Sequence, residues 1–190
     1  MDYTDSRTAD AASVGVMKSS SARKIVLAGA VAAVYAALTI VEAPIAYGPV
    51  QFRIAEALCV LPFFFPATVP GLFVGCIIAN LLSPYGILDI VAGAAASLLA
   101  ALATMLLGRI KRSTIAVKAI ACFPPVILNA IIIGGVIAWA STGGGGAFWA
   151  AFAVSGIQVG LGQLAVLYIL GLPLMIYLPK TRVFNYLSKY

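Results

Sequence analysis

Carboxylate side chains are the scarcest chemically active groups in most of this sequence, and their positions give the first indication of a site. After residue 24 only three occur, Glu42, Glu56 and Asp89, and long apolar stretches surround them. An ionised carboxylate accepts paired hydrogen bonds and attracts cations, but its burial is costly without a partner or a water-filled cavity. If the fold brings these groups together, they can bind a polar, hydrogen-bonding solute.

Other polar side chains could complete such a site. Arg53 stands three residues before Glu56, and Tyr47 lies in the preceding Gly- and Pro-containing loop, which is a candidate lid. Three amides could supply further donors and acceptors: Asn80, Asn129 and Gln158. Gln163 lies roughly 140° around a helix from Gln158 and is expected to face another neighbour.

Each of these residues also has a structural alternative. Arg53 could pair with Glu56 at this helical spacing or extend to lipid headgroups. Glu42 could mark an interfacial helix end, and Asp89 could stabilise the start of its helix. The amides could simply join neighbouring helices, and Tyr47 could belong to an interfacial aromatic belt.

Several classes of chemistry are excluded or disfavoured by what the sequence lacks. It contains no histidine, and its three cysteines are scattered singly, so histidine-based catalysis and CxxC metal or redox sites are absent. No GxxxxGK[ST] motif occurs, and the Gly143–Gly146 run lacks a lysine, so it reads as an external connector. The chain is therefore predicted not to be an enzyme, to need no cofactor and to depend on other subunits for ATP hydrolysis.

The composition predicts an all-α integral membrane protein. Of the 190 residues, 63% are hydrophobic and 9% are charged, too few charges to cover a soluble globule of this size. A helix of about 20 residues crosses the hydrocarbon core. Six apolar segments are candidate transmembrane helices: 25–41, 53–65, 68–82, 87–107, 119–140 and 148–178.

The lengths of these segments indicate which of them can cross the membrane completely. Segments 53–65 and 68–82 are short, which predicts helices that stop part-way, with loops covered by protein or lining a cavity. Segment 148–178 is long for one crossing. Prolines 124, 125 and 173 are expected to kink or interrupt their helices.

Basic residues predict the orientation. They gather before the first segment, between the fourth and fifth, and after the sixth, so six crossings place all three stretches on one side. The positive-inside rule makes that side, with both termini, cytoplasmic, and it puts the three carboxylates near the outer helix ends. We expect a flexible polar tail at 1–24, a membrane domain at 25–180 and a short basic tail at 181–190.

A ridge of small residues marks the first segment. Ala28, Ala32 and Ala36 are spaced four apart, a pattern that permits close helix packing within lipid. This face could dock another membrane protein or make an internal helix contact. The Gly71/Gly75 and Gly156/Gly160 pairs are interpreted as internal packing.

The stretch YGPVQFRIAEAL at 47–58, followed by Leu61-Pro62, resembles the queuosine-precursor transporter family. The resemblance continues in PGLFVG at 70–75, ANLL at 79–82 and LDIV at 88–91, and it covers residues 25–180. Members of this family are substrate-binding S components of energy-coupling-factor (ECF) transporters. The resemblance implies a six-helix S-component fold in a prokaryotic plasma membrane.

The resemblance also implies partners and a substrate. The partners are the membrane scaffold subunit EcfT, which meets the face matching Ala28, Ala32 and Ala36, and two cytosolic ATPases. The substrate is a 7-deazaguanine, delivered when the loaded subunit topples within the bilayer. Glu56 and Asp89 would bind the guanine edge and the 7-aminomethyl cation, in an order left open, with help from Asn80, Asn129 or Gln158.

Three other functions remain compatible with the sequence. The chain could be an S component for a different vitamin-like solute. It could be an intramembrane enzyme that uses Glu56 and Asp89 as an acid pair, or a structural or channel-like six-helix protein.

Overall fold

The computed structural model describes residues 5–48, 50–110 and 114–187, and the regular structure in these ranges is helical. The expected all-helical class is therefore confirmed. The elements follow in the order α1 Asp5–Val41, α2 Ala43–Ala46, η1 Ile54–Phe63, η2 Pro66–Thr68, α3 Val69–Asn80, α4 Gly86–Leu107, α5 Ile115–Ala121, α6 Phe123–Thr142, α7 Phe148–Val166, η3 Leu167–Gly171, α8 Leu172–Tyr177, η4 Leu178–Lys180 and α9 Arg182–Leu187.

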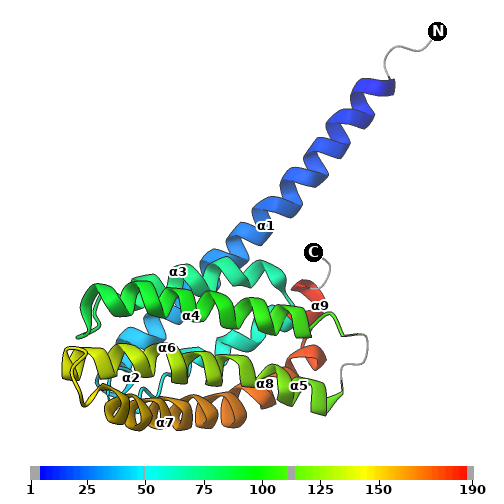
Figure 1. Cartoon of the computed structure of the whole chain (residues 1–190). Helices are drawn as coiled ribbons and strands as arrows, with labels where there is room; N and C mark the ends of the chain where they lie inside the picture. The colour runs from blue at the N-terminus through cyan, green and yellow to red at the C-terminus, as the bar shows by residue number, and fades with distance from the viewer. Residues whose placement is uncertain (1–4, 49, 111–113, 188–190) are drawn as a thin grey trace.

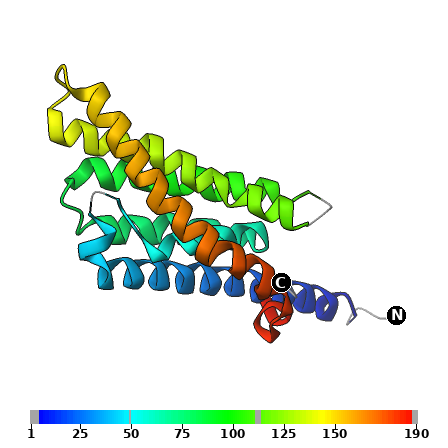
Figure 2. The ribbon, with the colours of Figure 1, turned by 90° about the horizontal axis from the view of Figure 1, so that it is seen from below.

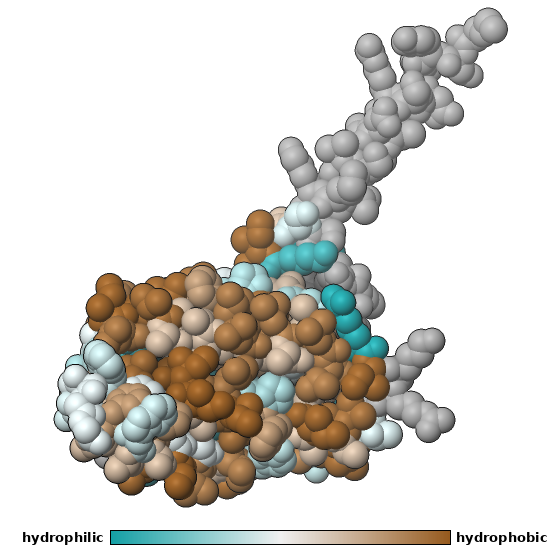
Figure 3. Space-filling view, in the orientation of Figure 1, coloured by the Kyte–Doolittle hydropathy of each residue, from teal (hydrophilic) through white to brown (hydrophobic). Residues whose placement is uncertain are grey.

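Four helical stretches in the described ranges are long and apolar enough to cross a membrane. They are Ser21–Val41, Gly86–Leu107, Ile115–Thr142 and Phe148–Lys180. Two shorter apolar helical stretches, Ile54–Phe63 and Pro66–Asn80, correspond to the two segments expected to stop part-way. Figure 3 shows the consequence, a broadly hydrophobic flank on the bundle.

Helices extend into both stretches predicted as tails. α1 begins at Asp5, within the predicted polar tail, and its first part projects away from the bundle (Figure 1). The stretch is rich in alanine and contains no proline before residue 44, a composition that favours continuation of a helix. At the other terminus, α9 occupies Arg182–Leu187 within the predicted basic tail.

Small residues bring α1 and α3 into close contact. A Cβ atom at Gly75 would lie 2.9 Å from the Ala32 carbonyl oxygen and 3.0 Å from the Tyr35 Cβ atom. Ala32 and Ala36 are buried in this contact, at 7% and 6% exposure. The alanine face considered for a partner therefore packs against α3, and Gly29, Ala33 and Ala37, spaced four residues apart, form an exposed small-residue face of α1.

Prolines explain the irregular elements. η1 is a 3₁₀ helix that contains Pro62, and it runs through the bundle with Glu56 on its buried side. The α5–α6 interruption falls at Cys122, just before Pro124, and a π-helical turn, η3, precedes Pro173. The expected proline interruptions are therefore confirmed at both places.

The bundle has two chemically different ends. One end contains the α3–α4 turn, α2 and the α6–α7 turn, and it includes Glu42 and Asp89. The start of α1 and α9 lie at the opposite end (Figure 2), where Arg23, Arg109 and Lys180 are exposed. The predicted segregation of carboxylates from basic residues is therefore present in the structure.

Candidate solute-binding site

Arg53 connects several of the predicted site residues. Its side chain is 3% exposed, and its Nη1 atom donates a hydrogen bond to Asn80 Oδ1 at 3.1 Å. Nη2 lies 3.6 Å from Asp89 Oδ2, and the guanidinium carbon is 5.0 Å from the centre of the Tyr47 ring. The structure thus joins Tyr47, Arg53, Asn80 and Asp89, which come from a loop and two helices.

The α3–α4 turn holds Asp89 toward this cluster. Asn80, the last residue of α3, donates from Nδ2 to the Asp89 backbone oxygen at 2.9 Å, and Ser83 Oγ donates to Asp89 Oδ2. Gly93 leaves the room that the Asn80 amide occupies, because a Cβ atom there would overlap it. Asp89 lies in the first turn of α4, but its side chain contacts Arg53 and Ser83, so it does more than stabilise the start of the helix.

Glu56 has a separate set of partners. It is 1% exposed, and its two oxygens accept hydrogen bonds from Tyr35 Oη at 2.6 Å and Cys59 Sγ at 3.1 Å. Arg53 makes its ion pair with Asp89, so the direct Arg53–Glu56 pairing considered from the spacing is not what the structure shows. Glu56 still contributes to the electrostatic environment of Arg53.

Tyr35 was not predicted as a site residue. It is fully buried within an apolar, alanine-rich helix, and nothing in the local sequence distinguishes it from a packing aromatic. The available signal was the chemistry of Glu56, because a buried carboxylate needs donors and the scarcity of polar residues leaves few candidates.

Glu42 lies apart from the Arg53 cluster. It is half-buried, and its Oε1 atom accepts a hydrogen bond from the Ala55 backbone N–H at 3.3 Å. The contact ties the end of α1 to the start of η1. Glu42 is therefore better explained as a structural link than as part of the candidate site.

A second set of buried polar groups lacks hydrogen-bond partners. Gln51, Asn129 and Gln163 are 2%, 4% and 2% exposed. Buried polar atoms without a hydrogen-bond partner in the described part of the chain include Gln51 Nε2, Asp89 Oδ1, Asn129 Nδ2 and Gln163 Oε1. An unpaired buried polar atom costs about 1–3 kcal/mol, so each of these residues is a candidate for contact with a polar ligand.

Helix packing brings these groups to neighbouring positions. Gly162 on α7 abuts the Val50 backbone so closely that a Cβ atom would overlap it, which places the loop before Arg53 against the helix next to Gln163. On α6, the Ala130 methyl group lies 3.4 Å from a Cβ built at Gly160, so Asn129 stands near the same level of α7.

Burial distinguishes Gln158, the glutamine preferred on sequence grounds, from Gln163. Gln158 is half-buried, whereas Gln163 is almost fully buried. Gln51 is the other residue that the sequence analysis missed, and it adopts a φ of 49°, which is uncommon for a non-glycine residue. Its buried amide at the tip of the candidate lid suggests a functional reason for this conformation.

Carboxyl groups outnumber basic groups in the described part of the site. One basic side chain, Arg53, lies near two carboxyl groups, Glu56 and Asp89, and both of these accept hydrogen bonds from neighbouring donors. In the nearby turn, burial and then the negative charge of Asp89 raise the pKa of Tyr85. The described residues contain no group of three metal-ligating side chains.

Comparisons with known proteins identify a family for this chain. A family model described as QueT transporter matches residues 25–180. Over 97 residues, the chain is 36% identical to the queuosine precursor transporter QueT of Lactococcus lactis subsp. cremoris (strain MG1363), a match covering 50% of this chain and 57% of that protein. No solved structure matches.

Proposed function

The chain belongs to the QueT transporter family, and we propose that it captures a queuosine precursor of the 7-deazaguanine class from outside the cell. The family match covers all six apolar segments. The match covers only 57% of the similar Lactococcus protein, so the family membership alone does not assign that protein's substrate to this chain. We therefore include the substrate in the proposal. Its support lies in the fit between the buried polar groups and such a base.

The observation that carries the proposal is the set of unpaired buried atoms. Asp89 Oδ1 and Gln163 Oε1 can accept, while Gln51 Nε2 and Asn129 Nδ2 can donate. A 7-deazaguanine offers N–H donors on one edge beside carbonyl and ring-nitrogen acceptors. Binding would supply hydrogen-bond partners for these buried atoms and thereby favour the loaded state.

The two carboxylates receive different roles in this proposal. Both oxygens of Glu56 already accept hydrogen bonds, whereas Asp89 retains one unpaired oxygen. Asp89 is therefore the carboxylate that contacts the ligand, and Glu56 supplies negative potential and helps to hold Arg53. A 7-aminomethyl cation could form an ion pair with the Asp89 carboxylate, which an uncharged 7-cyano group could not.

The loop before Arg53 controls access in this proposal. Tyr47 Oη donates to the Ala79 backbone oxygen, and Arg53 Nε donates to the Ala46 backbone oxygen at 3.1 Å. These bonds, with the contact of Val50 on Gly162, close the site. Ligand entry would require the loop to lift as a lid.

The proposal extends to energy coupling. We propose that residues 25–180 form an S component with six crossings and cytoplasmic termini in a prokaryotic plasma membrane. EcfT and two cytosolic ATPases would drive toppling and release. Because Ala32 and Ala36 are buried, the contact with EcfT is assigned to the exposed Gly29, Ala33 and Ala37 face of α1.

A ligand panel tests the proposed substrate. The purified chain in detergent would be titrated calorimetrically with 7-aminomethyl-7-deazaguanine, riboflavin, thiamine and biotin. We expect saturable binding of the deazaguanine alone, and a Glu42→Gln variant should bind equally well. Binding of another panel member in its place would identify an S component for a different solute and would contradict the proposal.

A further inference from the structure

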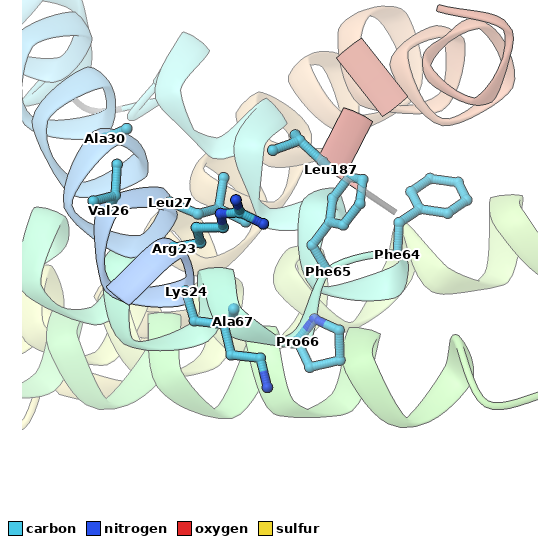
Figure 4. A pocket seen from close by; sticks show the side chains of 10 residues that line it. All are labelled: Arg23, Lys24, Val26, Leu27, Ala30, Phe64, Phe65, Pro66, Ala67 and Leu187. Atoms are coloured by element: carbon cyan, nitrogen blue, oxygen red, sulfur yellow. The ribbon is translucent and has the colours of Figure 1, made fainter. Parts of the chain in front are cut away.

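A cavity of about 810 Å³ lies at the basic end of the bundle, opposite the candidate solute site. Its walls come from α1, from the segment between η1 and α3, and from α9 (Figure 4). We propose that this cavity binds an anionic phospholipid, with the phosphate at its basic rim and an acyl chain on its apolar floor. The proposal is independent of the transported solute.

Charge provides the first argument. Arg23 and Lys24 line the cavity, and no carboxylate is among the lining residues in the described ranges. The Lys118 ammonium lies 5.8 Å from the centre of the Phe64 ring, which is part of the wall, and adds a third positive charge nearby. A site with this charge favours an anion.

The order of residues along α1 provides the second argument. Arg23 and Lys24 come directly before the apolar stretch, and Val26, Leu27 and Ala30 line the cavity beyond them. The step from residue 24 to residue 30 is about 9 Å along a helix. The cavity wall thus changes from cationic to apolar along α1, in the same order as the phosphate and the acyl chain of a lipid in a leaflet. A soluble anion would bind the cations without needing the apolar part of the wall.

The opposite wall is aromatic and is held in place by α9. Phe64 and Phe65 line the cavity, and the Phe184 ring packs on both, at centroid distances of 5.4 and 5.3 Å. Leu187 of the same short helix closes one side. Figure 4 shows the Arg23 side chain directed toward Phe65 and Leu187, so a basic group and the apolar wall share one hollow.

Native mass spectrometry of the purified full chain tests the assignment. Matched phosphatidylglycerol and phosphatidylcholine, with identical acyl chains, would be added in equal amounts. We expect a phosphatidylglycerol adduct in several-fold excess. The double variant Arg23→Gln/Lys24→Gln should lower that adduct about tenfold or more, since each cation near the surface contributes on the order of fivefold.

Controls distinguish the cavity from general attraction to a basic protein. The double variant Arg109→Gln/Arg182→Gln removes the same charge outside the cavity and should keep the adduct. Ala67→Phe should fill the apolar floor of the cavity and so lower the amount of phosphatidylglycerol adduct. Equal loss in the two double variants, equal adducts with both lipids, or displacement by millimolar inorganic phosphate would overturn the proposal. An unchanged thermal unfolding midpoint in detergent would show that each variant is folded.

Discussion

At the residue scale, identical functional groups have different roles because their surroundings differ. Glu56 is fully hydrogen-bonded, Asp89 keeps one unpaired oxygen, and Glu42 accepts a backbone N–H away from both. The same contrast separates Gln163 from Gln158, because only the former is almost fully buried. Burial and unmet hydrogen bonds, rather than residue type, define the candidate site.

The glutamine pair gives a matched test. Gln163→Leu removes a buried acceptor that has no partner, so we expect the thermal stability to be unchanged or higher while affinity for 7-aminomethyl-7-deazaguanine falls about 5- to 100-fold. Gln158→Leu should leave affinity unchanged. Calorimetric titration of both variants measures this, and equal losses would remove Gln163 from the site.

Tyr35 gives a second test, of stability. Tyr35→Phe deletes the hydroxyl that donates to Glu56 and leaves a buried carboxylate oxygen unpaired. We expect the free energy of unfolding to fall by about 1–3 kcal/mol. Tyr177→Phe, at an exposed position, is the control. Thermal unfolding in detergent measures both, and an unchanged midpoint for Tyr35→Phe would argue against this hydrogen bond.

At the element scale, interruptions of regular helices position the polar groups. The 3₁₀ geometry of η1 carries Glu56 into the bundle, and the turn between α3 and α4 places Asn80 against Asp89. Close contact at Gly75 lets Tyr35 on α1 approach this interior. The polar cluster therefore depends on small residues that allow the backbones to meet.

Leucine substitutions at two glycines test this dependence. Gly75→Leu would collide with the Ala32 backbone and should destabilise the fold by about 1–3 kcal/mol. Gly29→Leu meets nothing within 4 Å and should leave the fold intact. Unfolding midpoints of the two variants decide the matter, and similar values would contradict the α1–α3 contact.

Much of this arrangement could be predicted from the sequence. The positions of rare polar residues near the ends of apolar segments predicted Arg53, Asn80 and Asp89 as members of the candidate site. The prolines predicted where the helices are interrupted. The angular spacing separated Gln158 from Gln163 but could not say which one faces inward, because that depends on how α7 packs against its neighbours. The ridge of Ala28, Ala32 and Ala36 was likewise compatible with a partner-docking face or with an internal helix contact. Only the packing of this ridge on α3 distinguishes the two possibilities.

At the scale of the whole molecule, polarity is divided between the two ends. The candidate solute site lies toward the carboxylate-bearing end, and the basic end holds the cavity proposed for an anionic lipid. Between them the flank is apolar (Figure 3). This division is consistent with the proposed capture of a solute at the carboxylate-bearing end.

Assembly gives a prediction at this scale. Ala33→Leu places a branched side chain on the exposed small-residue face of α1, so co-purification with EcfT should be lost while ligand affinity is retained. Ala95→Leu, at an exposed position on α4, should preserve the complex. Pull-down of tagged EcfT measures both, and an intact complex with Ala33→Leu would place the contact elsewhere.

The account depends most on a direct contact between the Asp89 carboxylate and the ligand. The decisive measurement is the affinity of the wild type and of Asp89→Asn for the 7-aminomethyl and 7-cyano forms of 7-deazaguanine, obtained by calorimetric titration. We predict that the substitution weakens binding of the cation by about 30-fold or more and that of the cyano form much less. Equal losses for the two ligands, or no loss for either, would contradict the account.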